Sequence, residues 1–260
     1  MKSWLLIYLL LLINMNLFGQ SLFFKNIDKE FLTGKINYCE DARFMRVGKE
    51  HSLRQVYLNP TVYEAFIKMA DAAKFDGLDL RIVSGARSFE EQKIIWEKKW
   101  QSLPDTVPQD RIKRILEFSS MPATSRHHWG TDIDINSVES SYFTSEKGIA
   151  EYQWLINNAG KFGFYQVYNN QASGRTGYSE EKWHWSYMPL ANFFLRAYNE
   201  QVTYADILGF EGADLAEEFS LIASYVNGIS TVAIPRAVAV VTAQRLTIDQ
   251  LREKRKIFVN

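Results

Sequence analysis

The sequence predicts an α+β fold in which helices pack on a small, mainly antiparallel sheet. Segments whose apolar residues have helical spacing are mixed with short segments in which polar and apolar residues alternate. The chain shows no internal repeat and no low-complexity stretch. Its 260 residues, 47% of them hydrophobic, suit one compact domain with a substantial core.

The predicted helices begin at recognisable start signals. Apolar side chains recur with helical spacing over 59–74, and Pro60 stands near the start, where proline is tolerated. The helix predicted over 89–100 follows Ser88, and Glu91 three residues later completes a capping box. Two further helices are predicted, at 111–118 and 148–161.

The predicted strands are short. Residues 78–83 alternate and end at a Ser-Gly pair, and 182–187 form another strand candidate. Residues 131–135 read Thr, Asp, Ile, Asp, Ile, which is typical of a strand with one solvated and one buried face. Beyond them, 229–241 are apolar and β-prone, and 247–256 predict a capped, highly charged helix.

Charge and cysteine content exclude several kinds of protein. Lys+Arg and Asp+Glu are both 30, so the chain lacks the basic excess expected of a nucleic-acid-binding protein. The single cysteine, Cys39, allows neither an intramolecular disulfide nor a cysteine-based zinc site. We expect Cys39 to be a small buried hydrophobic residue.

The N-terminus predicts export. A lysine precedes the apolar run 4–13, which has the length of a signal-peptide core and is too short to span a bilayer, for which about 20 residues are needed. We expect a signal peptide at 1–20, a catalytic domain at 21–230 and a C-terminal extension of unknown role at 231–260. The mature protein is then secreted into the periplasm or cell envelope, with no stable membrane insertion. The alternative is an uncleaved anchor that holds the same domain outside the membrane.

Two segments combine histidine with carboxylates and predict a metal site. A catalytic zinc site uses three protein ligands and leaves one position to water. His127, Asp134 and His184 can supply the ligands from a loop and two strands. Zinc lowers the pKa of its water to about 7, and Glu181 is the carboxylate that can take the proton and pass it to the leaving amine.

The residues alone leave two ligand choices open. Asp132 lies on the same strand face as Asp134, and His128 is the neighbour of His127. Either neighbour is a competing ligand, and spacing alone favours Asp134.

Glu181 can act as the base only if its side chain lies on the same side as that of His184. Glu181 stands three residues before His184, so in a regular strand their side chains face opposite ways. Glu181 must therefore lie in an irregular entry to the strand.

Two ordered motifs, S-x-H-x-x-G-x-x-x-D and then E-x-W-H, resemble those of the VanY-type D-alanyl-D-alanine carboxypeptidases and their zinc-peptidase relatives. The residues that carry them are Ser125, His127, Gly130, Asp134, Glu181, Trp183 and His184. The stretch 84–92 resembles the family's S-G-x-R-S-x-x-x-Q segment, and the similarity extends over about 31–229. The family's small residue two before the aspartate is Asp132 here.

The resemblance implies a Zn²⁺ cofactor and a peptidoglycan stem peptide as substrate, from which the terminal D-alanine is removed. The zinc ligands that it implies are His127, Asp134 and His184. Glu181 is then the general base, Arg87 stabilises the developing oxyanion or holds the peptide carbonyl, and Ser125 and Gln92 help to bind the substrate terminus. The tyrosines that are candidates to line the cleft are Tyr142, Tyr165, Tyr168 and Tyr178. The oligomeric state stays open.

Other functions compete with this one. Relatives with the same motifs act as peptidoglycan endopeptidases or as D-Ala-D-Ala dipeptidases. A non-catalytic module that binds zinc or wall peptide is disfavoured because it has no need of Glu181. The segment 179–182 matches the S-x-x-K motif of serine penicillin-binding enzymes, but their downstream K-T-G motif is missing.

Overall fold

A computed structural model describes residues 27–230 of the chain. Ile27 and Ile229, near the two ends of this range, are both buried at 7% exposure. The signal peptide predicted at 1–20, the extension at 231–260 and its charged helix lie outside the described residues, as does most of the apolar stretch at 229–241. Within 27–230, no helix has both the length and the apolar character needed to cross a bilayer.

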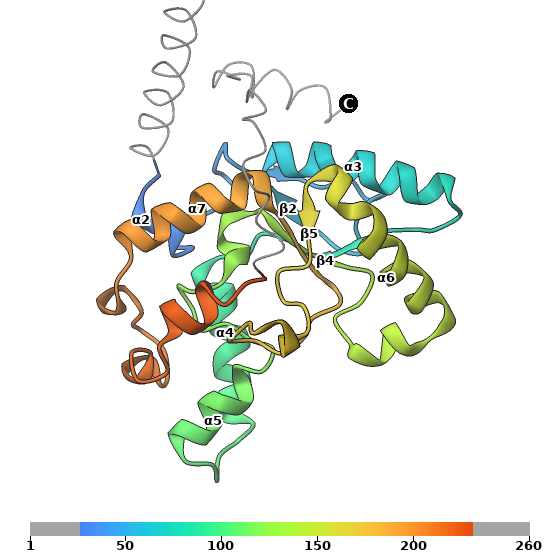
Figure 1. Ribbon diagram of the computed structural model, residues 1–260. Helices are drawn as coiled ribbons and strands as arrows, with labels where there is room; N and C mark the ends of the chain where they lie inside the picture. The colour runs from blue at the N-terminus through green and yellow to red at the C-terminus, as the bar shows by residue number, and fades with distance from the viewer. Residues whose placement is uncertain (1–26, 231–260) are drawn as a thin grey trace, which may run out of the picture.

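The central sheet has four antiparallel strands in the order β3-β4-β6-β5, of which β4 and β5 are labelled in Figure 1. Its strands are β3 (Ile82–Ser84), β4 (Asp132–Ile135), β6 (His184–Tyr187) and β5 (Phe164–Tyr165). A separate antiparallel pair is formed by β1 (Met45–Arg46) and β2 (Tyr57–Leu58). Helices pack around these strands, so the predicted α+β class with a small antiparallel sheet is confirmed.

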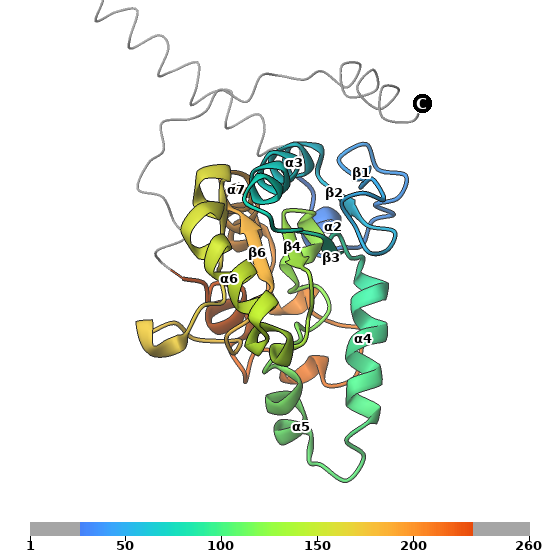
Figure 2. The ribbon, with the colours of Figure 1, turned by 90° about the vertical axis from the view of Figure 1, so that its right-hand side faces the viewer.

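One face of the sheet is apolar. Ile133 and Ile135 of β4 and Trp185 of β6 belong to one core cluster with α3 (Pro60–Phe75) and α6 (Glu146–Asn158). Figure 2 shows α6 and α4 on opposite sides of strands β4 and β6. The burial of Ile133 and Ile135 confirms the buried face that the sequence predicts for this strand.

The other face of the sheet carries polar side chains. By alternation these are Asp132, Asp134, His184 and Ser186. The prediction that this face is solvated is wrong, because Asp132 is 0% and Asp134 4% exposed. The 3₁₀ turn Arg126–Trp129 packs against β4, and α4 (Phe89–Gln101) lines the cavity that Asp134 and His184 face.

The helix starts follow their local signals. The Asn59 side chain accepts a hydrogen bond from the backbone of Thr61 (3.0 Å) at the start of α3. The capping box at the start of α4 is confirmed, since the Ser88 hydroxyl accepts from Glu91 N and the Glu91 carboxylate accepts from Ser88 N. Helix α5 spans Pro108–Ile115 and so begins three residues earlier than predicted.

Two local predictions fail, and one helix was missed. Strand β3 begins only at Ile82, four residues after the predicted start. Helix α7 (Met188–Gln201), which follows β6 directly, was not predicted, and it packs on α2 (Lys29–Leu32). Cys39 is exposed rather than buried, because it lies in a surface turn closed by Glu40 N and the carbonyl of Asn37 (3.1 Å).

Candidate active site

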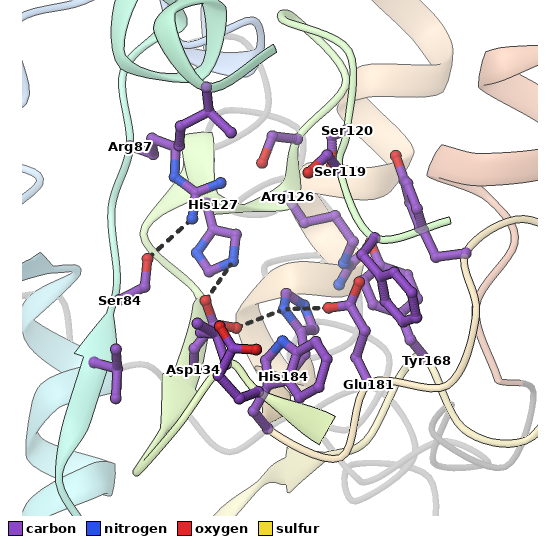
Figure 3. Close-up of a pocket in the computed structure, with 18 of the residues that line it drawn as sticks. Ser84, Arg87, Ser119, Ser120, Arg126, His127, Asp134, Tyr168, Glu181 and His184 are labelled. Carbon is purple, nitrogen blue, oxygen red and sulfur yellow. Dashed lines mark hydrogen bonds and ion pairs between the residues drawn. The ribbon is translucent and has the colours of Figure 1, made fainter. Parts of the chain in front are cut away.

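The three predicted metal ligands converge. His127 comes from the 3₁₀ turn after a loop, Asp134 from β4 and His184 from β6 (Figure 3). Their ligand atoms all lie within 4.8 Å of one another. Asp134 and His184 are direct cross-strand partners, and the rings of His127 and His184 are 5.0 Å apart.

Both imidazoles are oriented by their second nitrogen. His127 Nδ1 lies 2.8 Å from the carbonyl oxygen of Gly85, which leaves Nε2 facing Asp134 Oδ2 at 3.5 Å. His184 Nε2 lies 2.9 Å from Asp132 Oδ2, which leaves Nδ1 facing Asp134 Oδ1 at 3.1 Å. Hydrogen bonds of this kind fix the ring and tautomer of a metal-binding histidine.

Asp132 lies behind the cluster rather than in it. Its carboxylate accepts hydrogen bonds from Arg126 Nε (2.9 Å), Thr131 Oγ1 (2.7 Å) and Ser186 Oγ (2.8 Å). Burial raises the pKa of Asp132, but the Arg126 guanidinium and the two histidines, His184 and His127, together outweigh this and hold the pKa below its usual range. The structure therefore places Asp134, not Asp132, among the converging ligand atoms.

His128 points away from the cluster. Its Nδ1 lies 2.7 Å from the carbonyl oxygen of Arg87, and its ring packs against Gly34. Its Nε2 is buried and has no hydrogen-bond partner among the described residues. Burial lowers the pKa of His128 to about 3, so the imidazole is neutral. Of the two neighbouring histidines, His127 is the one that the fold brings to the cluster.

Glu181 meets the geometric condition placed on it. It precedes β6 in a turn in which His184 N donates to the Glu181 carbonyl (3.3 Å). The turn brings both side chains to the same side, with Glu181 Oε2 3.8 Å from His184 Nδ1. Burial raises the pKa of Glu181 to about 8, and the charges of His184 and Arg87 oppose this shift.

Arg87 reaches the same space from the start of α4. Its Nη1 donates to Gln92 Oε1 (2.6 Å) and its Nη2 to Ser84 Oγ (3.0 Å). Gln92 is 0% exposed, donates to the carbonyl of Ser120 (2.7 Å) and is not among the residues that line the cavity. Gln92 therefore supports Arg87, and direct contact between Gln92 and a substrate stays a prediction.

A cavity of about 500 Å³ opens over the cluster. Ser125 lines it, and the Ser125 hydroxyl is buried without a hydrogen-bond partner among the described residues. Of the four candidate tyrosines, Tyr168 and Tyr178 line the cavity, and the Tyr168 ring lies 4.6 Å from that of His184. Such a cavity, with few convergent polar groups and perturbed pKa values, has the character of an active site.

Sequence reasoning missed the support behind His184. Arg126 is a cation six residues before the extra aspartate, and that spacing could have suggested an Arg126–Asp132 pair. Ser186 gave no signal, because it reaches Asp132 across the sheet from 54 residues away.

The part of the chain that carries the site resembles known proteins. The family model VanY, D-alanyl-D-alanine carboxypeptidase, matches residues 55–190. The protein YodJ of Bacillus subtilis (strain 168) is 30% identical over 141 residues, which are 54% of this chain and 49% of YodJ. A D-alanyl-D-alanine carboxypeptidase of Enterococcus faecalis (strain V583) is 30% identical over 136 residues, 51% of this chain and 47% of that protein. The chain thus spans about half the length of the curated relatives it matches.

A solved structure also aligns with the chain. It is a mutant of the vancomycin resistance D,D-pentapeptidase VanY from a VanB-type cassette, in complex with Zn(II), with a TM-score of 0.47 and 23% identity over 66% of this chain and 93% of its own. The segment matched by the family model, 55–190, holds every residue assigned to the site and covers more than half of the sequence. This chain belongs to the VanY family of D-alanyl-D-alanine carboxypeptidases.

Proposed function

We propose that this chain is a zinc-dependent D,D-carboxypeptidase that hydrolyses the bond before the terminal D-alanine of peptidoglycan stem peptides. The observation that carries the proposal is the convergence of His127, Asp134 and His184, with Glu181 beside them in one cavity. Family membership supports the same activity, and the name of the Enterococcus faecalis relative agrees with it.

The donor set fits zinc. Two imidazole nitrogens and one carboxylate oxygen are a common ligand set of catalytic zinc sites, which leave a further position open. The second nitrogen of each imidazole is already used, by Gly85 for His127 and by Asp132 for His184. The nitrogens that remain therefore face Asp134, as a shared cation requires.

Bound zinc would supply Lewis acidity and lower the pKa of water to about 7. Glu181 takes a proton from the attacking water and gives it to the leaving nitrogen of D-alanine. Its carboxylate is suited to both transfers because it lies beside the ligands and is nearly excluded from solvent, at 6% exposure. A pKa raised by burial favours a carboxylate that holds the proton between the two transfers.

Arg87 is positioned to stabilise the oxyanion that develops on the scissile carbonyl. Gln92 and Ser84 hold its guanidinium by one hydrogen bond each, so the donors are oriented before the substrate arrives. The Ser125 hydroxyl, which has no partner among the described residues, is free to bind the substrate terminus. Gln92 then contributes to substrate binding through Arg87.

A free D-Ala-D-Ala dipeptide is an alternative substrate for the same site. One relative, from Enterococcus gallinarum, is named as both a D-Ala-D-Ala dipeptidase and a D-Ala-D-Ala carboxypeptidase, so the dipeptide belongs in the test.

The test uses the purified whole chain with a stem pentapeptide ending in D-Ala-D-Ala, with and without a chelator, and reads the products by mass. We expect loss of one alanine, inhibition by the chelator and recovery when zinc is added. Cleavage inside the stem would identify an endopeptidase, and cleavage of free D-Ala-D-Ala alone a dipeptidase. Zinc binding without cleavage of any of these peptides would favour a binding module.

We also propose that the chain acts in the cell envelope as a secreted or periplasmic protein, because its substrate is there and its first residues resemble an export signal. Cell fractionation with a C-terminal tag, followed by determination of the N-terminal residue, tests this. Cytoplasmic protein that begins at Met1 would contradict it.

A further inference from the structure

The mouth of the cavity carries charged side chains that the proposed reaction does not use. Lys99 reaches it from α4, and Glu139 from the segment after β4. Both side chains line the same cavity as the candidate ligands. Burial lowers the pKa of Lys99, and the carboxylates of Glu181 and Glu139 oppose this shift, so the Lys99 charge acts on both the candidate base and Glu139.

Lys99 is held in place by a neutral partner. Its Nζ donates to Ser119 Oγ at 2.5 Å, and Ser119 is 7% exposed. No carboxylate of the described residues lies within 4.0 Å of the ammonium group. Its charge is therefore fixed at the mouth of the cavity without an ion-pair partner.

Glu139 supplies the opposite charge. Its backbone is fixed by a hydrogen bond from Glu139 N to Ser137 Oγ (3.1 Å), and its side chain is exposed. Within residues 27–230 the Glu139 carboxylate makes no ion pair, with Lys99 or with any other cation. Besides Arg54, the exposed lining of the cavity thus offers Lys99 as a cation and Glu139 as an anion to whatever part of a substrate extends outward.

Resting on the proposed function, we propose that Lys99 and Glu139 form a subsite for the charged side chain of the residue upstream of the terminal D-Ala-D-Ala. A side chain that ends in both an ammonium group and a carboxylate, as in diaminopimelate, satisfies both residues. A lysine side chain offers only the ammonium group and leaves Lys99 unpaired. Lys99 is then a specificity-determining residue that favours the dicarboxylic substrate.

The test compares two stem pentapeptides that differ only at the third residue, diaminopimelate or lysine. We expect the whole chain to show a kcat/KM about fivefold higher for the diaminopimelate peptide, mainly through KM, as for a solvent-exposed ion pair. Lys99→Met should lower kcat/KM for that peptide to the level of the lysine peptide, and Lys99→Arg should keep the preference. The neighbouring lysine on α4 provides the matched control, Lys98→Met, which should keep it too.

Glu139→Gln should lower kcat/KM for both peptides alike, because both carry the ammonium group. No change in this variant would remove Glu139 from the subsite.

Two results would overturn the assignment of Lys99. One is equal kcat/KM for the two peptides with the unmodified chain, and the other is an equal loss on both peptides in Lys99→Met. A preference that disappears in Arg54→Met instead would assign the carboxylate to Arg54, another cation that lines the cavity.

Stem peptides carry a second carboxylate, on the glutamate that precedes the third residue. Peptides in which this glutamate is amidated test whether Lys99 pairs with it instead. If amidation, rather than the third residue, sets the dependence on Lys99, the proposed diaminopimelate selection is wrong.

Binding of the same peptides is measured by calorimetry. Absence of turnover would then overturn the proposed function, while the binding preference would still decide the role of Lys99.

Discussion

His184 Nε2 lies 2.9 Å from Asp132 Oδ2, so this imidazole is anchored by a carboxylate on the side facing away from Asp134. Asp132 is itself fixed by Arg126, Thr131 and Ser186, and it is fully buried. A buried ion pair with further hydrogen bonds therefore determines which nitrogen of His184 faces the metal site.

Asp132→Asn should weaken zinc binding about 10- to 100-fold without removing a ligand. The amide is a poorer acceptor for His184 and leaves the buried Arg126 charge uncompensated. Competition with a chromophoric chelator measures the affinity, and metal content in excess zinc should remain near one per chain. Complete loss of metal would show that Asp132 is itself the ligand.

His127→Ala should lose zinc, whereas His128→Ala should retain it. The fold directs His127 Nε2 to Asp134 and ties His128 Nδ1 to the Arg87 carbonyl. Metal content after gel filtration, read by elemental mass spectrometry, checks both variants. Equal metal content in the two would reverse this assignment.

Glu181→Gln should lower kcat by a factor of about 10² to 10⁴ and leave zinc bound. The change removes the proton acceptor but keeps the size of the side chain beside His184. Turnover of the stem pentapeptide and metal content are measured on the same sample. Glu180→Gln, one residue away and not among the cavity-lining residues, is the matched control and should keep its activity. Loss of zinc from Glu181→Gln would mean that this carboxylate is a ligand.

Gly34→Ala should destabilise the fold more than Gly77→Ala. Both glycines have positive φ, +74° and +82°, so alanine costs about 1–2 kcal/mol of backbone strain at either position. At Gly34 the added methyl group would also clash with the buried His128 ring, whereas at Gly77 nothing lies within 4 Å. Urea unfolding followed by circular dichroism measures the difference. Equal losses would show that the His128 ring moves aside freely.

The predictable parts of the fold are those set by neighbours in sequence. The capping box of α4 needs only Ser88 and Glu91, and the alternation in β4 needs only five consecutive residues. The local sequence does not show which elements cover each face of a strand, because these elements come from distant parts of the chain. Asp132 and Asp134 have the pattern of a solvated strand face, yet both are buried, and the turn that carries His127 packs against their strand.

The candidate site shows the same limit. The motifs predict the ligand types and the base, because each motif is short and its chemistry depends on residue type. They do not reveal that Gln92 faces Arg87 rather than the cavity, since that depends on where α4 docks. Lys99 was not singled out either, because a lysine on a charged helix has no distinctive local pattern.

Because Asp134 and His184 are direct partners across β4 and β6, a bound metal would stabilise one register of these strands over others. A slip of one residue between β4 and β6 would turn one member of the pair toward the apolar layer of α3 and α6 and separate the two donor atoms. Mispaired chains would then lose the stabilisation that zinc binding gives the folded state. This stabilisation is about 2.7 kcal/mol when the free zinc concentration is 100 times the dissociation constant. Bound zinc would therefore favour the register in which Asp134 faces His184.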